Sequence, residues 1–470
     1  MKFGGTSMGD ADCIRRAARI VIDATKEASV IVVVSAMGGV TNRLVDAAHR
    51  SAAGDEGPSH SLANALRDEH FAAADTLVSD LSARQELKVQ LEKITSQVSD
   101  LCHGVRLLRE LTPKSLATLS SIGERLSAPL MASALTDEGL KSAAVSATEL
   151  IVTDDQFDQA EPLMAQVRER AKSRLLPLLE KEITPVVTGF IGATLDGALT
   201  TLGRGGSDYS ATTLGAATNA DEIVIWTDVD GVLTADPRLV PEARLLHEIS
   251  YKEAAELAYF GAKVLHPKTL RPVAEAGIPV WIRNSFAPER AGTRITQTGR
   301  TSANGVRAIT AISNVSLITV GGRGMVGAVG VAAKMFAAVA SVRANVLLIS
   351  QSSSENDICL IVESADASQT LKALKKAFAR DLDHHDVEYI TVNDEIAIVA
   401  VVGEKMHGTP GMAGRTFSAL GDRGINIIAI AQGSSEYNVS FVVEKHAMRS
   451  AVAAIHEEFK LHLPPATESS

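Results

Sequence analysis

Residues 1–300 alternate short apolar runs with segments of helical periodicity. The apolar runs are rich in β-branched residues and cover positions 29–35, 184–188, 222–227 and 278–283. Between them, apolar residues recur at helical spacing over positions 14–26, 162–181 and 252–257. Near-continuous apolar strands are typical of a parallel sheet covered on both faces, and their alternation with helices predicts a layered α/β domain.

Residues 62–111 have a different pattern. This stretch contains no proline, a single glycine (Gly104), and Leu, Val and Ile residues at helical spacing. We therefore expect long amphipathic helices inserted into the α/β domain, with the charged residues on their solvated face.

A polar segment at 287–305, rich in Gly, Thr and Ser, marks the expected end of the first domain. Beyond it the chain repeats itself, because residues 315–363 align without a gap on residues 396–444. Each copy predicts a strand, a glycine-containing turn, a helix, two strands and a second helix. This order indicates two ferredoxin-like βαββαβ modules.

Composition narrows the function classes. The chain has 470 residues, of which 46% are hydrophobic, 22% charged and only 4% aromatic, and its net charge is −10. An acidic chain with few aromatic side chains is a poor partner for nucleic acid. Three widely spaced cysteines (Cys13, Cys102 and Cys359) predict neither a disulfide framework nor a metal cluster. Without an apolar signal core or spanning segment, we expect a soluble, cytoplasmic protein with no membrane partner.

Glycine loops supply the candidate chemistry. The sequence KFGGTS at 2–7 ends a strand and opens a helix, and GRGGSD at 203–208 precedes a helix of small residues, with Ser207 or Asp208 as its expected cap. Glycines let backbone amides approach a phosphate, and a helix N-terminus adds positive potential. TDVDG at 227–231 follows a buried strand, where ligand contacts are the rule in an open α/β sheet.

Six motifs together identify a family. KFGGTS (2–7), VSAMGGVTN (34–42), IGERLS (122–127), GRGGSD (203–208), TDVDG (227–231) and GAKVLHP (261–267) resemble aspartate kinases of the amino-acid-kinase family, in the family's order. The repeat resembles the paired ACT domains of that family. The resemblance implies an amino-acid-kinase domain at 1–300, one ACT domain at 313–380, and a second formed by 305–312 with 394–461. It also implies transfer of the γ-phosphoryl group of ATP to the side chain of L-aspartate, with Mg²⁺ on the nucleotide.

The resemblance also implies roles for single residues. The catalytic pair is Lys2 and Asp208. The residues expected to bind aspartate are Ser35, Thr41, Glu124, Phe190, Arg204 and Ser207. The residues expected to bind ATP are Lys2, Gly4, Gly5, Ser7, Thr227, Asp228, Leu233, Arg238 and Lys263.

The ACT pair implies allosteric control and a homo-oligomer, a dimer or tetramer, assembled through these domains. The expected effector contacts are Gln351, Gln432, Asn345 and Asn426. The sequences ISQSSSE and IAQGSSE resemble threonine-sensing more than lysine-sensing members, so threonine is the expected effector and lysine the alternative. Some relatives continue into a homoserine dehydrogenase, which is not expected here.

Two departures from the family pattern affect these expectations. Only Met1 precedes Lys2, so the first strand is expected to be short and Lys2 poorly anchored. Leu233 stands where relatives often have Tyr near the adenine. Two alternatives stay open: a catalytically impaired amino-acid sensor, and another carboxylate kinase of the same fold, such as an acetylglutamate or carbamate kinase.

Overall fold

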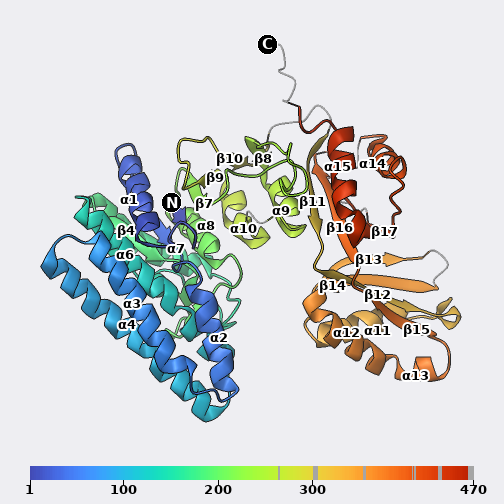
Figure 1. Cartoon of the computed structure of the whole chain (residues 1–470), viewed down its shortest axis with the longest axis horizontal. Helices are drawn as coiled ribbons and strands as arrows, with labels where there is room; N and C mark the ends of the chain where they lie inside the picture. Colours follow the sequence, from blue (N-terminus) through green and yellow to red (C-terminus); the bar gives the residue numbers. More distant parts are fainter. Residues whose placement is uncertain are drawn as a thin grey trace. The chain divides into compact units, whose positions relative to one another are not determined.

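The computed structural model describes residues 1–262, 265–299, 305–352, 356–404, 406, 409–431 and 437–463, apart from the side chains of residues 58 and 59. The described chain forms two compact units (Figure 1). The first unit contains Met1–Val232, His247–Tyr251 and Val264–Gly299, and the second contains the rest. The second unit therefore includes Leu233–Leu246 and most of helix α9 (Tyr251–Tyr259), which precede residue 300 in the sequence.

An eight-stranded sheet forms the centre of the first unit, in the order β3-β4-β2-β1-β7-β9-β10-β8. Its strands are β1 (Lys2–Phe3), β2 (Val32–Val34), β3 (Ser142–Val145), β4 (Thr184–Thr188), β7 (Ile223–Thr227), β8 (Glu248–Ser250), β9 (Val280–Asn284) and β10 (Thr293–Thr296). The first six strands in this order are parallel, and β10 is antiparallel to β9. Val32, Val33 and Val34 are all buried, as expected of a strand covered on both faces. The α/β fold class is thereby confirmed.

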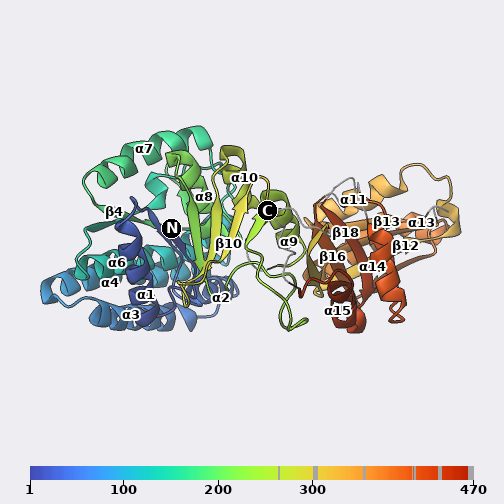
Figure 2. The same cartoon turned by 90° about the horizontal axis from the view of Figure 1, so that it is seen from above.

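Helices cover both faces of this sheet (Figure 2). They are α1 (Ala11–Thr25), α2 (Val40–Ala52), α3 (Pro58–Leu77), α4 (Leu81–Leu108), α5 (Pro113–Ser120), α6 (Ile122–Asp137), α7 (Met164–Glu180), α8 (Gly206–Thr218) and α10 (Pro267–Ala276). A short hairpin of β5 (Ile191–Ala193) and β6 (Leu199–Thr201) and the turn η1 (Ala147–Glu149) complete the unit. The long amphipathic helices expected at 62–111 are α3 and α4, whose buried positions include Leu87, Leu91 and Val98.

The second unit contains two four-stranded sheets, in the orders β13-β14-β12-β15 and β11-β16-β18-β17. The first repeat supplies β12 (Val315–Gly321), η2 (Arg323–Met325), α11 (Val331–Ser341), β13 (Val346–Gln351), β14 (Asp357–Glu363), α12 (Ser364–Ala377), α13 (Ala379–Asp383) and β15 (Tyr389–Asn393). The second repeat supplies β16 (Ile396–Gly403), α14 (Met412–Gly421), β17 (Ala429–Ala431), β18 (Asn438–Glu444), η3 (Lys445–Ala447) and α15 (Met448–Glu458).

The two sheets obtain their fourth strands from different places in the chain. β11 (Val306–Ile312) lies before the first repeat but pairs antiparallel with β16 of the second. This is the pairing expected for residues 305–312. β15 pairs with β12, so the sheet of the first repeat extends beyond residue 380, where the sequence analysis ended it.

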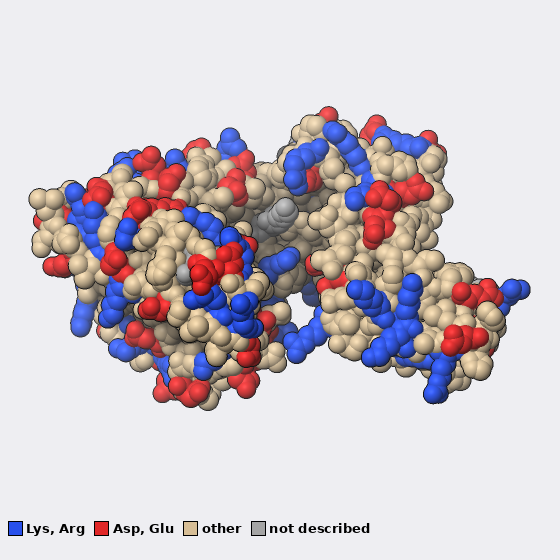
Figure 3. Space-filling view, turned by 60° about the horizontal axis from the view of Figure 1, so that its bottom comes forward, with Lys and Arg blue, Asp and Glu red and all other residues tan. Residues whose placement is uncertain are grey.

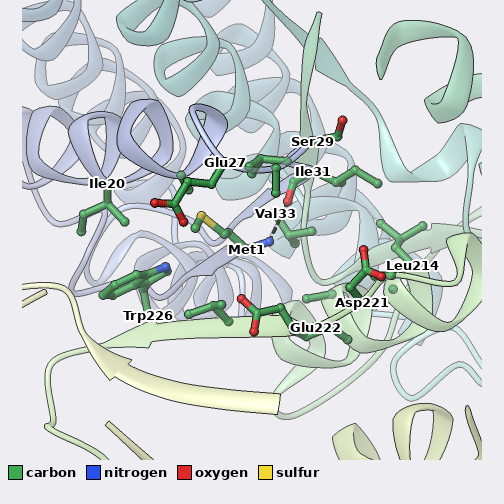
Figure 4. Close-up of a pocket in the computed structure, with 18 of the residues that line it drawn as sticks. Met1, Ile20, Glu27, Ser29, Ile31, Val33, Leu214, Asp221, Glu222 and Trp226 are labelled. Carbon is green, nitrogen blue, oxygen red and sulfur yellow. Dashed lines mark hydrogen bonds between the residues drawn. The ribbon is translucent and has the colours of Figure 1, made fainter. Parts of the chain in front are cut away.

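The central strand β1 is only two residues long, and a cavity of about 740 Å³ lies beside Met1, the residue that precedes it (Figure 4). The cavity opens between β2 and β7 and is lined by Met1, Ile31, Glu222 and Trp226, among others. The ammonium group of Met1 donates to the carbonyl oxygen of Ile31 at 2.7 Å. Burial lowers the pKa of this ammonium group from 8.0 to about 5, so the group is neutral near pH 7.

Candidate active site

Five parallel strands end at one edge of the first sheet, and expected site residues lie at or near four of these ends. Lys2 lies in β1, Ser35 directly follows β2, and Phe190 lies two residues after β4. Thr227 ends β7 and Asn284 ends β9. Because the carboxyl ends of parallel strands share an edge, the fold gathers residues from distant parts of the sequence at one place. Ligands of open α/β sheets bind at such an edge.

Lys2 and Asp208 form the central ion pair of this edge. Lys2 Nζ lies 2.5 Å from Asp208 Oδ1, and the two side chains are only 10% and 15% exposed. The expectation of a short first strand is met, but that of a poorly anchored Lys2 is wrong. The lysine is held by β-pairing to Val33 and Ile225 and by the carboxylate. In this position its charge faces the site with little screening by water.

Helix α8 begins without a side-chain cap. Its N-cap is Gly205, which adopts a left-handed φ of +70°, and neither Ser207 nor Asp208 caps the helix as expected from the sequence. Asp208 points instead to Lys2, from within the first helical turn. The Gly206 N–H donates to the Gly203 carbonyl oxygen, whereas the N–H groups of Ser207 and Asp208 have no side-chain cap acceptor and can donate to an anion.

The first glycine loop is fixed by β7. The Gly4 N–H donates to the Trp226 carbonyl oxygen at 3.1 Å, and the Met8 N–H donates to the Gly4 carbonyl oxygen at 3.0 Å. A Cβ atom at Gly5 would lie 3.4 Å from the Ala36 carbonyl oxygen, so the loop lies close to the segment that follows β2. The hydroxyl of Ser7 is buried and lies 2.8 Å from the hydroxyl of Ser285.

Glu124 is the most strongly perturbed carboxyl group of the site. It lies in the first turn of α6, is 3% exposed, and burial raises its pKa from 4.5 to about 8. The Lys2 ammonium and backbone N–H groups oppose this shift, and Oε2 has no hydrogen-bond partner among the described residues. Gly123 allows the helix to approach, because a Cβ atom there would lie 2.5 Å from Ala36 Cβ. A buried carboxyl group with one free oxygen suits a cationic ligand group.

The loop after β4 lies against the first turns of α8. Phe190 has a φ of +69°, and its N–H donates to Ser210 Oγ of α8 at 2.9 Å. A Cβ atom at Gly189 would lie 2.8 Å from Ser207 Cβ, so only glycine allows this approach. Arg204 is exposed and forms no ion pair with any described residue. Ser35 and Thr41 are half-buried, the latter in the first turn of α2.

The expected ATP residues are divided between the units. Thr227 and Asp228 lie at the carboxyl end of β7 in the first unit, whereas Leu233 and Arg238 belong to the second. Arg238 is exposed and pairs with Asp236 at 2.6 Å. Lys263 lies outside the described residues.

Three of the expected effector residues are described, and they lie in or shortly before strands of the second unit. Gln351 is exposed at the end of β13, and Asn345 is exposed directly before that strand. Asn426 is exposed shortly before β17. Gln432 lies outside the described residues.

The end of β9 also contributes to the site, although no sequence motif indicated it. Ser285 contacts Ser7, and Asn284 Nδ2 donates to Asp230 Oδ1 of the TDVDG loop at 2.7 Å. The strand at 278–283 was expected, so the rule that ligand sites follow strand ends could have indicated both residues. Their polar side chains alone do not distinguish them from ordinary loop residues.

The site residues fit a nucleotide. The free oxygen of Glu124, the buried Lys2 ammonium and the uncapped start of α8 leave groups available to a charged ligand. Within the described parts of the chain, no three His, Cys, Asp or Glu side chains are grouped to hold a metal ion. Mg²⁺ carried on nucleotide phosphates needs only one or two carboxylates from a protein.

On the face of the molecule seen in Figure 3, acidic and basic side chains are interspersed.

Comparison with known proteins defines the class. Residues 1–284 match the model of the amino acid kinase family, and residues 318–378 and 399–459 each match an ACT domain. The chain therefore belongs to the amino acid kinase family.

Within this family the chain belongs to the aspartokinases, as its relatives show. The chain is 34% identical to aspartokinase 1 of Arabidopsis thaliana, over 98% of this chain and 79% of that protein. It is 36% identical to the bifunctional aspartokinase/homoserine dehydrogenase of Daucus carota, over 98% of this chain but 50% of that protein. The chain thus spans about half the length of several curated relatives that it matches.

A solved structure with the same fold is that of Escherichia coli aspartokinase III in complex with aspartate and ADP. Its TM-score is 0.81 at 32% identity, and the match covers 97% of this chain and 98% of that one. The same enzyme in complex with lysine and aspartate matches with a TM-score of 0.78. No helix in the described part of this chain is both long and apolar enough to cross a membrane.

Proposed function

We propose that this chain transfers the γ-phosphoryl group of ATP to the side-chain carboxylate of L-aspartate, which gives 4-phospho-L-aspartate and ADP. The observation that carries the proposal is the buried Lys2–Asp208 pair at the carboxyl edge of the sheet, next to a glycine loop. The bound aspartate and ADP of the E. coli relative support the same assignment.

The reaction needs positioning and charge neutralisation more than proton transfer. A free aspartate side chain has a pKa of about 3.9, so the attacking carboxylate is ionised at neutral pH and needs no general base. Lys2 stabilises the negative charge of the transferred phosphoryl group, and Asp208 fixes the direction of the Lys2 side chain. Bound Mg²⁺ neutralises charge on the phosphates, and the carboxylate of Asp208 is the acidic group of this edge that lies nearest to Lys2.

Two charged side chains select the acceptor. Arg204 is exposed without an ion pair among the described residues and can bind the α-carboxylate of aspartate through two parallel hydrogen bonds. Glu124 can receive the α-ammonium group, which would bring the pKa of its carboxyl group down from about 8. Ser35, Thr41, Phe190 and Ser207 line the same pocket in this proposal. N-acetylglutamate has no free ammonium group for Glu124, which argues against an acetylglutamate kinase.

A hydroxamate assay tests the proposal. With L-aspartate, ATP and Mg²⁺, the protein should give aspartyl hydroxamate in the presence of hydroxylamine, and N-acetylglutamate should give none. Product from N-acetylglutamate alone would favour the other carboxylate kinase. No product at any magnesium concentration, from a folded protein that still binds an amino acid, would favour a catalytically impaired sensor.

Feedback control acts through the ACT domains, with threonine as the effector and lysine as the alternative. The sequences around Gln351 and Gln432 support threonine, whereas the E. coli relative was solved with lysine. The active form is a homo-oligomer, a dimer or tetramer, assembled through these domains. The expected cytoplasmic location stays a prediction.

A further inference from the structure

We propose that Ser285 is a positioning residue for the phosphate-binding loop, acting through the hydroxyl of Ser7. This inference rests on the proposed function, because it assumes that the KFGGTS loop holds the phosphates of ATP. It assigns a role to the segment after β9, which no motif of the sequence analysis contains.

The contact between the two serines is built into the fold. Ser7 and Ser285 are each 2% exposed, and their Oγ atoms lie 2.8 Å apart. Ser285 Oγ also lies 3.2 Å from the Thr227 carbonyl oxygen, and Ser7 Oγ lies 3.4 Å from the Trp226 carbonyl oxygen. The pair therefore joins the loop after β1 to the ends of β7 and β9.

The segment that carries Ser285 is itself held in place. Asn284 Nδ2 donates to Asp230 Oδ1 at 2.7 Å, and Arg290 forms an ion pair with the other oxygen of Asp230. The Ser285 N–H donates to the Thr227 carbonyl oxygen at 2.9 Å. Phe286 lies under the guanidinium group of Arg16, 4.7 Å from Cζ to the ring centre. These contacts fix the Ser285 hydroxyl relative to both the TDVDG loop and α1.

The protons of the Ser7 and Ser285 hydroxyl groups cannot serve all of their contacts at once. Two hydroxyl groups have two protons, but three contacts need a donor: Ser7 to Ser285, Ser285 to Thr227, and Ser7 to Trp226. When a phosphate oxygen accepts a hydrogen bond from Ser7, the Ser7 hydroxyl gives up its contact with Trp226, and Ser285 must donate to Ser7 and give up its contact with Thr227. Both losses are small, because the Gly4 and Ser285 N–H groups still donate to those two carbonyl oxygens. Ser285 thus allows Ser7 to donate to phosphate while the Ser7 oxygen keeps a donor of its own.

Steady-state kinetics and ATP binding test the role. We expect Ser285→Ala to raise the KM for MgATP about five-fold, the value of one net hydrogen bond, while kcat and the KM for aspartate change less than two-fold. Ser285→Thr keeps the hydroxyl and should restore the KM. Ser51→Ala, which also removes a buried serine hydroxyl but lies at the end of α2, is the control and should leave all three constants unchanged.

A double-mutant cycle separates an action through Ser7 from a general effect on the fold. In the Ser7→Ala background, Ser285→Ala should cause no further rise in KM, because the hydroxyl that it orients is absent. An additive effect, an unchanged KM in Ser285→Ala, or failure of Ser285→Thr to restore it would overturn the proposal.

Calorimetric titration with ATP in the absence of aspartate distinguishes this proposal from the proposed function. If the native chain lacks aspartate kinase activity, a weaker ATP affinity in Ser285→Ala that Ser285→Thr restores still supports the role of Ser285. Equal ATP affinities of the native chain and Ser285→Ala would contradict it, whatever the acceptor.

Discussion

Lys2 Nζ of β1 and Asp208 Oδ1 of α8 lie 2.5 Å apart, in an environment where both side chains are largely buried. The two glycine loops that carry them are far apart in the sequence and meet only because β1 is central in the sheet and α8 packs beside it. Both partners of an ion pair in this environment are needed, since removing one of them leaves the other as a buried charge without compensation.

Removing either charge should abolish most of the activity. We expect Lys2→Met and Asp208→Asn each to lower kcat for aspartyl phosphate formation by about 10²–10³-fold, the usual effect of losing one electrostatic contact to a transition state. Lys88→Met is the matched control, because Lys88 forms an ion pair with Asp75 at 2.7 Å on the helical insertion. A Lys2→Met variant that is folded by circular dichroism and retains native kcat would contradict the assignment.

Glu124 should make stability depend on pH. Its pKa is about 8 in the folded chain against an ordinary 4.5, so between these values the folded state holds a proton that the unfolded state has released. The free energy of unfolding should therefore fall as pH rises through this window, by on the order of 4 kcal/mol. Urea denaturation at pH 5 and pH 8 measures the free energy of unfolding of the native chain and of Glu124→Gln. Only the native chain should show the decrease that the Glu124 carboxyl group causes.

Glu138→Gln serves as the control for this experiment, since Glu138 is exposed at the end of the same helix. It should leave the pH dependence unchanged. If the native chain and Glu124→Gln lost stability in parallel between pH 5 and pH 8, the buried neutral carboxyl group would be disproved.

Gly205 should tolerate no side chain. Gly205→Ala combines a left-handed φ of +70° with a Cβ atom 2.8 Å from His266 Cβ. Gly277→Ala is a close control, because Gly277 has a φ of +69° but nothing within 4 Å of an added Cβ. We expect Gly277→Ala to lose about 1 kcal/mol of stability, and Gly205→Ala about 1–3 kcal/mol more together with most of its activity, since it displaces the start of α8. Equal losses by urea denaturation would show that the contact with His266 is relieved without cost.

Gln351 should affect regulation and not catalysis. It is exposed at the end of β13, so Gln351→Ala should keep the basal kcat while the concentration of threonine for half-inhibition rises at least five-fold. Gln369 is an exposed glutamine on α12 of the same repeat, and Gln369→Ala should leave inhibition unchanged. Inhibition curves with threonine and with lysine, measured separately, check both the residue and the effector. Unchanged inhibition by both amino acids would exclude Gln351 from the effector site.

Much of the architecture could be predicted from apolar periodicity. The strand at 184–188 matches β4, and the run at 222–227 matches β7 to within one residue, because long apolar runs between turns leave few alternatives. β8, β10 and β15 were not expected. They are edge or near-edge strands with a weaker apolar pattern, and pairing with neighbours decides their conformation.

Site residues could be predicted from the sequence where both partners of a contact lie in recognisable motifs. Lys2 and Asp208 belong to recognisable motifs, and the packing of α8 beside β1 brings them together. The expected cap at Ser207 or Asp208 was wrong, because an N-cap preference is local while the attraction of Asp208 to Lys2 depends on the tertiary fold. Ser285 was missed for the same reason, since its partner Ser7 is brought to it only by the sheet.

β11 and β16 each adjoin an end of the first repeat in the sequence. β11 ends at Ile312 and β12 starts at Val315, while β15 ends at Asn393 and β16 starts at Ile396. Within the first repeat, Leu317 near the start of β12 pairs with Asn393 at the end of β15. Once that repeat has folded, the two segments leaving it are neighbours, so the entropy of closing the long loop between β11 and β16 has already been lost. The folded first repeat therefore holds β11 and β16 close together, and changes that weaken it should also destabilise the pairing of these two strands.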